Sequence, residues 1–541
     1  MKLASFGVAT NTTAFPFHFP IIQRNHQVWR SNSGIFSEAL LADTVVSAKE
    51  RSRRKNRSFS STPSPPPAPV SPSSDKELAG GMGWKKLSSK ELGITTTMIS
   101  KPTRLVLNGL KKNGYQVYLV GGCVRDLILK RAPKDFDVIT SANLYQVMRT
   151  FSRCEIIGRR FPICHVHVDE CIIEVSSFKT SERGSKNELP YPFKKPPKCD
   201  ELDFLRWKNC VKRDFTINGL MFDPYSHLVY DYIGGLADIK KAKVRTVIPS
   251  RTSFQDDCAR ILRGIRIAAR LDFKFTKETA LAIRDFANTV LRLDKSRLHM
   301  EVNYMLSYGS AESSLRLLWK LGLLEILLPI QAAYFVRQGF RRRDERSNML
   351  LSLFSNLDIL LAPNRPCHSC LWAGLLAFHH ALDSEPREPL VVAAFALAVH
   401  NGGNLPEAIA ISKGITHCYD SSYPEILPPH EERVDHDLVN KVLDFASAVR
   451  SSLSMMQDEN YISQAMSEYA DAPYSNLALI SWQVFLKVCD MFGCSTIPMK
   501  SGFVPKRGSK IYYDKLIEGD LAEVRHVFAR VVFDTVYPPN T

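Results

Sequence analysis

Apolar residues recur along residues 97–177 with two different spacings. Met98, Leu105, Val106 and Leu110 are available for one face of a helix over 97–112, because helical residues on the same side recur every three to four positions. The same reasoning predicts short helices at 122–130 and 144–151, whereas short apolar runs predict strands at 116–120, 136–139, 155–157, 163–168 and 171–177. Strands that alternate with helices and then follow one another directly indicate a small mixed sheet with helices on one side.

From about Ser253 onward the apolar spacing is helical almost throughout. The predicted amphipathic helices include Asp256–Leu271, Lys277–Val290, Arg297–Leu306 and Ala311–Leu321. We therefore expect an α/β head over 95–250, a helical neck over 251–330, and a helical body and tail over 331–541 that binds RNA. Inside the head, the polar, Pro-rich and basic stretch 178–210 is predicted to be a mobile insertion.

Residues 1–80 lack sustained apolar periodicity and are rich in Ser, Thr and basic residues. They include the basic cluster Lys49–Arg57 and the Pro/Ser-rich linker Ser60–Asp75, and they contain few acids. This composition is typical of an organellar transit peptide, and a Pro/Ser tract cannot bury a core. We therefore expect import into a mitochondrion or a chloroplast. A nuclear signal or an RNA-contacting arm is the alternative interpretation of the basic cluster.

The chain is strongly basic. Its formal net charge of +16 over 541 residues indicates a polyanionic partner, nucleic acid first of all, although residues 1–80 supply part of the charge. Twelve cysteines without regular spacing indicate free thiols rather than a disulfide framework. The apolar run Pro389–His400 is too short to span a membrane and is predicted to be a core helix, so no membrane partner is expected.

The residues that carry chemistry gather between positions 118 and 140, where the sequence reads YLVGGCVRDLILKRAPKDFDVIT. Asp135 and Asp137 stand two apart in an extended segment, so both carboxylates point to one face and can hold hard cations side by side. Upstream, Gly121 and Gly122 open a predicted helix, where glycine lets a phosphate approach backbone N–H groups at the positive helix end. Metal ligands beside a phosphate cradle indicate nucleotidyl transfer.

Five sequence blocks, in order, resemble the class II nucleotidyltransferases, the family of bacterial-type poly(A) polymerases and CCA-adding enzymes. The blocks are LVGGCVRDLIL, KDFDVIT, IIEVSSF, VKRDFTINGL and QDDCARILRGIRIAARLDF, and the resemblance covers about residues 99–329. Each block alone is a weak signal, whereas the ordered set is specific. The resemblance implies a polymerase-beta-like head, ATP as the substrate, and the 3′ ends of mRNA, rRNA or tRNA as partners.

The catalytic carboxylates follow from the chemistry of the metal. Mg²⁺ takes oxygen ligands and keeps substrate phosphates and waters in its shell, so two or three carboxylates suffice; Mn²⁺ is the alternative ion. Asp135 and Asp137 are the expected ligands, and the third is Glu174 on a later strand that could lie beside the first. Two ions would activate the attacking 3′-hydroxyl and stabilise the leaving pyrophosphate. A lone Asp-x-Asp is more often a turn or a cap, but the upstream Gly-Gly-x-Val-Arg-Asp favours the metal site.

The remaining blocks carry nucleotide-binding residues. On the helix after the glycines, Arg125 can grip phosphate and Asp126 can fix the loop, unless the two form only a surface ion pair. The resemblance implies that Arg213, Asp214 and Asn218 meet the triphosphate, the ribose or the loop backbone.

Selection of the base is expected in the last block. Asp257 and Arg260 are three apart in one predicted helix, and the resemblance implies that they read the base edge of the incoming nucleotide. An ordinary surface salt bridge is the alternative interpretation. Arg263 and Arg266 continue the same face and are candidates for contact with phosphates or the primer.

Poly(A) addition and CCA addition share all these blocks. The segment IIGRRFPICHVHV matches the signature of bacterial-type poly(A) polymerases through Arg159, Arg160, Phe161 and His165. A basic pair beside an aromatic ring could also stack a base and neutralise RNA phosphate. We therefore expect a template-independent adenylyltransferase that adds AMP from ATP to RNA 3′ ends. The alternatives are a CCA-adding tRNA nucleotidyltransferase and a catalytically degenerate RNA-binding relative.

Three further stretches are ambiguous. CHSC at 367–370, with two histidines downstream, invites a zinc interpretation, but a second Cys pair is missing and the sequence continues as an apolar helix. The basic stretches Arg337–Arg346 and Val504–Lys510 could guide an RNA backbone or could be solvated faces.

Overall fold

The computed structural model describes residues 84–158, 162–179, 199–429, 435–467, 480–494 and 503–538. The predicted transit peptide over 1–80 and the signature residues Arg159, Arg160 and Phe161 therefore lie outside the described residues. What was expected of them stays a prediction.

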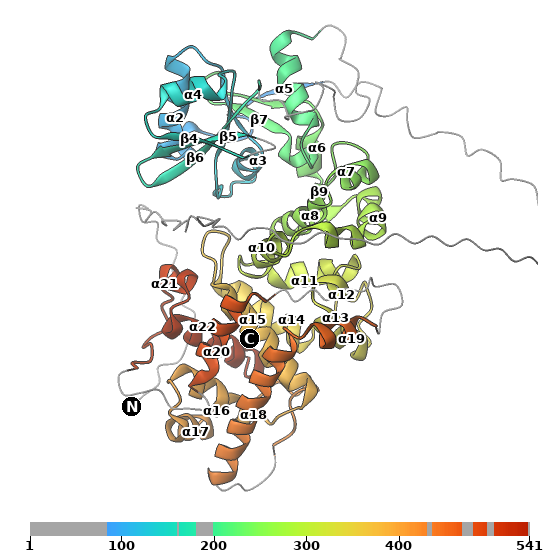
Figure 1. Cartoon of the computed structure of the whole chain (residues 1–541), viewed down its shortest axis with the longest axis vertical. Coiled ribbons are helices and arrows are strands. Elements are labelled where there is room, and N and C mark those ends of the chain that lie inside the picture. The colour runs from blue at the N-terminus through green and yellow to red at the C-terminus, as the bar shows by residue number, and fades with distance from the viewer. Residues whose placement is uncertain are drawn as a thin grey trace, which may run out of the picture. The chain divides into compact units, whose positions relative to one another are not determined.

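The head is built on an eight-stranded mixed sheet (Figure 1). Its strand order is β1-β8-β7-β2-β3-β6-β5-β4, in which β3 and β6 are parallel and every other neighbouring pair is antiparallel. The strands are β1 Lys85–Ser88, β2 Val117–Val120, β3 Asp137–Thr140, β4 Cys154–Ile157, β5 Ile163–Val168, β6 Cys171–Ser177, β7 Leu220–Asp223 and β8 Leu228–Asp231. Two short strands, β9 (Lys243–Val244) and β10 (Lys274–Phe275), pair in parallel outside this sheet.

Helices make up most of the rest of the described chain. Those of the head are α2 Lys101–Lys112, α3 Gly122–Ile128, α4 Leu144–Thr150, α5 Glu201–Val211 and α6 Gly235–Lys240, with 3-10 turns at Thr96–Met98 and Thr216–Asn218. The neck holds α7 Ser250–Asp256, α8 Ala259–Leu271, α9 Lys277–Asp285, a 3-10 turn at Ala287–Arg292, α10 Lys295–Leu306, α11 Ala311–Lys320 and α12 Leu324–Leu327. The later helices are α13 Pro329–Arg337, α14 Met349–Leu360, α15 Ser369–Ser384, α16 Pro389–His400, α17 Leu405–Lys413, α18 Asp435–Met455, α19 Glu459–Ser467, α20 Trp482–Gly493, α21 Tyr513–Glu518 and α22 Leu521–Val536.

Both faces of the head sheet are covered, because successive residues of a strand point to opposite faces. Val138 of β3 packs with buried residues of α2 and α4, whereas its neighbour Ile139 packs with Trp207 of α5. The mixed α/β head is confirmed, but the expectation of helices on one side alone is wrong. Part of the predicted insertion 178–210 is also wrong, because α5 is a helix whose N-terminus is capped by the side chain of Asp200.

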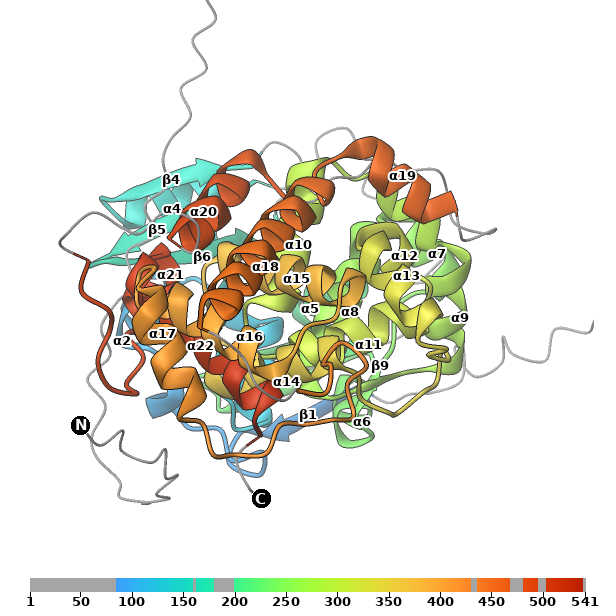
Figure 2. The same ribbon diagram turned by 90° about the horizontal axis from the view of Figure 1, so that it is seen from below.

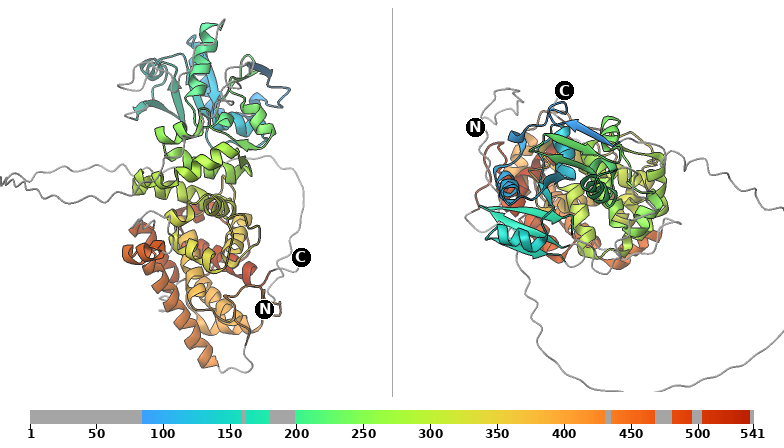
Figure 3. Two further views of the ribbon diagram at one scale, coloured as in Figure 1. Left: turned by 90° about the vertical axis from the view of Figure 1, so that its right-hand side faces the viewer. Right: turned by 90° about the horizontal axis from the view of Figure 1, so that it is seen from above.

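A single hydrophobic core runs through the neck and the body, from Phe254 to Val536. The predicted helix Pro389–His400 is confirmed as α16, and α18 packs against both α15 and α16 (Figures 2 and 3). No helix within the described ranges could cross a membrane. Cys367 and Cys370 are free thiols buried in this core, and their burial raises both pKa values to about 12.

Candidate active site

The two central carboxylates of the site lie side by side on the only parallel pair of strands in the eight-stranded sheet. Val138 of β3 is in register with Val175 of β6, so Asp137 and Glu174 come one position earlier on adjacent strands. Val138 and Val175 are both buried in the core beneath α2 and α4. Asp137 and Glu174 therefore point to the opposite face, as the alternation of a strand requires. Asp135 is exposed in the loop that enters β3.

The face continues outward from β6 as a row of ionisable side chains. His165 of β5 is opposite Glu174, with Nε2 3.8 Å from Glu174 Oε1, and Glu155 of β4 is opposite His165. Among the predicted signature residues, His165 is thus the one that the described structure places beside a predicted catalytic carboxylate. Glu174 remains about half exposed, at 52% of its side-chain surface, so it stays open to a ligand.

Asp137 lies in an environment that suits a bound cation. Its burial raises the pKa of the carboxyl to about 6; Arg213 opposes this shift, and the charges of Glu174 and Asp135 add to it. The donor set is all oxygen, which is the ligand type of hard divalent metals. Within the described ranges, no group of three or more His, Cys, Asp or Glu side chains is placed to hold a metal ion. Two carboxylates suit a hard ion whose remaining ligands are substrate phosphates and water.

The glycine pair supplies the space beside Asp137. Gly121 has φ 82° and ψ −142°, a conformation open to glycine alone in practice. A Cβ atom at Gly121 would lie 2.7 Å from Arg213 Nη1 and 3.4 Å from Asp137 Oδ2. Residues far apart in the sequence therefore meet at one point, where the positive φ disfavours any side chain and a Cβ atom would push the Arg213 guanidinium aside.

Four of the predicted nucleotide-binding residues form a buried network instead of an open phosphate grip. Arg125 donates through Nε and Nη2 to Asp126 Oδ1 at 2.9 and 2.7 Å, and through Nη1 to Asn218 Oδ1 at 2.6 Å. Asn218 Nδ2 donates to Asp214 Oδ1 at 3.0 Å, and Arg263 Nη1 donates to Asp214 Oδ2 at 3.0 Å.

The network is electrostatically satisfied. Burial alone would raise the pKa of Asp214, but Arg263 and the donated hydrogen bonds hold it below its ordinary value. The chain of bonds runs from α3 through the 3-10 turn Thr216–Asn218 to α8. Its members therefore connect the glycine helix to the neck through buried hydrogen bonds.

The predicted base-reading pair is brought together, but not on one helix. The helix expected over Asp256–Leu271 is confirmed as α8 from Ala259 to Leu271, but its predicted start is wrong, because Asp257 ends α7 with an extended backbone (φ −151°, ψ 99°). Arg260 Nε still lies 3.9 Å from Asp257 Oδ2, and Arg260 Nη1 donates to Ser253 Oγ at 2.9 Å. Asp257 keeps 45% of its side-chain surface exposed and Arg260 keeps 18%, so the acceptor faces outward while the guanidinium group is mostly covered.

The neck also holds residues that sequence reasoning missed. Glu301 of α10 is buried and binds two guanidinium groups, Arg266 Nε at 2.9 Å and Arg297 Nη2 at 3.1 Å. Lys134, which directly precedes Asp135, places its ammonium 4.4 Å from the ring centre of Tyr304 and 4.8 Å from that of Tyr308. We term these three residues the lysine clamp. A basic residue beside the Asp-x-Asp was visible in the sequence, but its contact with Tyr304 in a predicted amphipathic helix and with Tyr308 just beyond that helix was not.

Two segments of the chain match known protein families. Residues 117–245 match the poly A polymerase head domain. Residues 272–335 match a family described as "Probable RNA and SrmB-binding site of polymerase A". The first match covers β2 to β9 and therefore contains Asp135, Asp137, Glu174 and Arg213. The second begins just after α8 and includes the clamp tyrosines.

Similar proteins of known name include two kinds of nucleotidyltransferase. Poly(A) polymerase I of Haemophilus influenzae is 33% identical over 260 residues, which are 47% of this chain and 56% of that protein. The CCA-adding enzyme of Streptococcus uberis is 29% identical over 245 residues, 45% of this chain and 57% of that protein. The chain thus spans about half the length of the curated relatives it matches. A crystal structure of the Bacillus stearothermophilus CCA-adding enzyme with CTP is similar at 22% identity and a TM-score of 0.39, over 73% of this chain and 83% of that one.

Proposed function

We propose that this chain, which in its head and neck belongs to the class II nucleotidyltransferases, is a template-independent enzyme that adds AMP from ATP to RNA 3′ ends. The observation that carries the proposal is the position of Asp137 beside Glu174 on the parallel strands, with Asp135 two residues away. Gly121 and Arg213 lie next to the carboxylate of Asp137. Such a face can hold both a cation and a phosphate, which is what nucleotidyl transfer needs.

In the proposed reaction, the RNA 3′-hydroxyl oxygen forms a bond to the α-phosphorus of ATP while the bond from that phosphorus to the pyrophosphate oxygen breaks. The hydroxyl proton is lost and pyrophosphate leaves. Asp135 and Asp137, with Glu174 on the adjacent strand, would offer carboxylate oxygens to a divalent metal, Mg²⁺ or alternatively Mn²⁺, whose remaining ligands would come from substrate phosphates and water; its charge would favour the alkoxide and the leaving group. Arg213 contributes a fixed positive charge beside Asp137, suited to a triphosphate oxygen.

Recognition of adenine is assigned to Asp257 and Arg260, whose acceptor and donor groups lie 3.9 Å apart at the turn between α7 and α8. Two hydrogen-bonding groups of opposite character suit the edge of a base. Arg125, Asp126, Asn218 and Asp214 have a positioning role, because their polar groups are already engaged with one another. Arg263 binds Asp214 within that network, and Arg266 binds Glu301 beside it.

Sequence identity supports poly(A) addition over CCA addition, since the chain is 33% identical to a poly(A) polymerase and 29% identical to a CCA-adding enzyme. The purified chain should be incubated with labelled RNA of unrelated sequence and with each nucleoside triphosphate singly. Extension into a long homopolymer with ATP alone is the expected result. Use of CTP first, only on tRNA-like ends and with a stop after few additions, would establish CCA addition instead. RNA binding without incorporation of any nucleotide would mark a degenerate relative.

The composition of residues 1–80 supports import into an organelle as a separate proposal. These residues carry the basic cluster Lys49–Arg57 with few acids nearby. A fusion of residues 1–83 to a fluorescent protein should accumulate in mitochondria or chloroplasts. Accumulation in the nucleus would favour the alternative interpretation of the basic cluster.

A further inference from the structure

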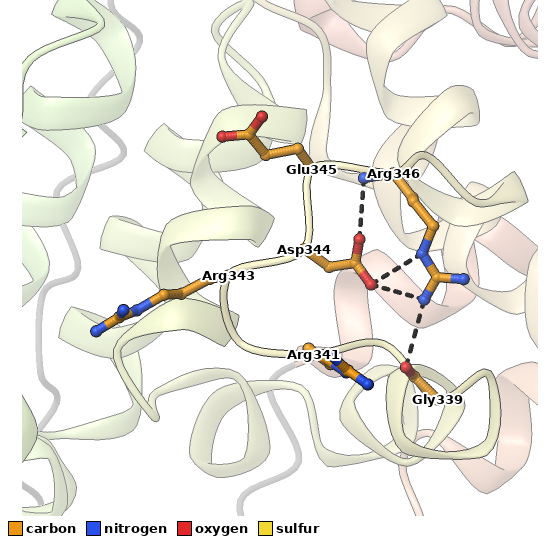
Figure 4. Close-up of a pocket in the computed structure, with 6 residues that line it drawn as sticks. All are labelled: Gly339, Arg341, Arg343, Asp344, Glu345 and Arg346. Atoms are coloured by element: carbon orange, nitrogen blue, oxygen red, sulfur yellow. Dashed lines mark hydrogen bonds and ion pairs between the residues drawn. The ribbon is translucent and has the colours of Figure 1, made fainter.

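The loop between α13 and α14 presents an unusual concentration of arginine. Residues 339–346, here called the arginine loop, read GFRRRDER and border a pocket of about 760 Å³ (Figure 4). The pocket is lined by Gly339, Arg341, Arg343, Asp344, Glu345 and Arg346. In the sequence, the arginine loop closely follows the segment 272–335 that matches the RNA-binding family.

Two of the four arginines hold the loop in place. Arg342 donates to Glu325 and stacks on Trp319, with its guanidinium carbon 3.8 Å from the ring centre. Arg346 forms a fork with Asp344 Oδ2 at 2.9 and 2.6 Å, drawn as dashed lines in Figure 4. Arg316 of α11 adds hydrogen bonds to the carbonyl groups of Asp344 and Arg346. The backbone of the loop is therefore anchored at several points to the neck.

The other two arginines are presented by this frame to solvent. Arg341 and Arg343 are exposed, and in the part of the chain that the structure describes neither guanidinium makes an ion pair. Figure 4 shows that their side chains leave the loop in different directions, whereas Asp344 turns toward Arg346. Two divergent guanidinium groups cannot chelate one anion, but they can contact two anions that are linked in a chain. Glu345 is the exposed carboxylate of the same pocket.

We propose that the arginine loop binds the phosphate backbone of single-stranded RNA, with Arg341 and Arg343 each contacting a separate phosphate. The proposal rests on the proposed function in taking RNA as the substrate. A guanidinium group matches the geometry of a phosphate. Because the loop is already anchored before RNA binds, less conformational entropy is lost when each contact forms. Backbone contacts carry no base information, so the loop would increase affinity for RNA of any sequence.

The test measures RNA affinity without catalysis. The full chain binds a labelled single-stranded RNA in EDTA and without ATP, at several salt concentrations. Each phosphate contact with a single strand contributes about 0.7 to the slope of log affinity against log salt. Arg341→Gln and Arg343→Gln should therefore each flatten the slope by about 0.7, and the double variant by about 1.4, because the two contacts are independent. Glu345→Gln removes a competing carboxylate and should tighten binding about two- to five-fold at low salt.

A matched control separates a specific contact from the loss of net charge. Arg104 and Lys112 are exposed on α2, and the double variant Arg104→Gln/Lys112→Gln removes the same two charges from the head. This control should leave the slope unchanged. An Arg341→Gln/Arg343→Gln variant that binds RNA with the affinity and slope of the control would overturn the inference, whether or not the protein adds AMP. If the wild-type protein adds no nucleotide, but the arginine variants show the stated change in slope relative to it, the proposed function is refuted and this inference stands.

Discussion

Replacing Lys134 with Met removes the ammonium group that holds the Asp135 loop to the neck. Its Nζ atom lies 4.4 and 4.8 Å from the ring centres of Tyr304 and Tyr308. A cation over an exposed ring contributes about 0.5–1 kcal/mol, so the two rings together stabilise this loop position by about 1–2 kcal/mol. Methionine keeps the length and apolar body of the side chain. AMP incorporation in a single turnover, at saturating ATP and RNA, should fall about 5- to 30-fold because fewer loops stay aligned.

The variants around the lysine clamp show whether the rings carry this effect. Lys134→Arg keeps the cation, and Tyr304→Phe/Tyr308→Phe keeps both rings, so both proteins should stay close to wild type. In a Tyr304→Leu/Tyr308→Leu background, Lys134→Met should cause little further loss, since its partners are already gone. The reasoning is refuted if Lys134→Met costs as much in that background as in wild type, or if it costs nothing in wild type.

Three further predictions concern the site and the body. Gly121→Ala should lower AMP incorporation more than ten-fold, because a positive φ costs a non-glycine residue about 1–3 kcal/mol and the new Cβ atom would displace Arg213. Gly122→Ala is the control and should be tolerated. Equal activities of the two variants in a steady-state assay would contradict this prediction. Asp257→Ala should reduce the preference for ATP over CTP in kcat/KM by about 10- to 100-fold, as expected for a lost hydrogen bond to a charged group, and an unchanged preference would exclude base reading by Asp257. Burial lowers the pKa of His379 to about 3, so the unfolded chain gains a proton below its own pKa of about 6.5 while the folded chain does not. The contribution of His379 to the free energy of unfolding is then fully present above about pH 6.5 and falls by about 1.4 kcal/mol per pH unit below it. His379→Gln should reduce the pH dependence of the free energy of unfolding in urea by that amount. An unchanged pH dependence would contradict the prediction.

Local patterns in the head translated directly into structure. The strands expected at 163–168 and 171–177 are β5 and β6 with the same bounds, because each is a short apolar run closed by a turn. The pairing of the Asp137 strand with the Glu174 strand was also predictable, since a later apolar strand in so small a sheet has few places to go. The coverage of the second sheet face was missed, because α5 follows a Pro-rich stretch whose polarity masks the helix start at Asp200.

Contacts between distant residues could not be predicted from spacing. The apolar period runs without interruption through residues 256–271, and it hides the extended backbone at Asp257. Arg125 was expected to face a phosphate. Its guanidinium group instead donates a buried hydrogen bond to Asn218, which is 93 residues away in the sequence. The lysine clamp depends in the same way on a tertiary contact, in which Lys134 of the head meets Tyr304 and Tyr308. Which side chains are free for a ligand is thus a property of the tertiary structure, even where the residue types indicate the chemistry.

The central claim is that the face carrying Asp135, Asp137 and Glu174 performs transfer of AMP to RNA. Its most direct test is single-turnover incorporation of labelled ATP by Asp137→Ala, beside Glu155→Gln, which removes an exposed carboxylate from the same sheet face. Asp137→Ala should bind RNA with nearly wild-type affinity and incorporate no AMP above background, while Glu155→Gln should retain activity. Residual turnover in a folded Asp137→Ala protein would contradict the account.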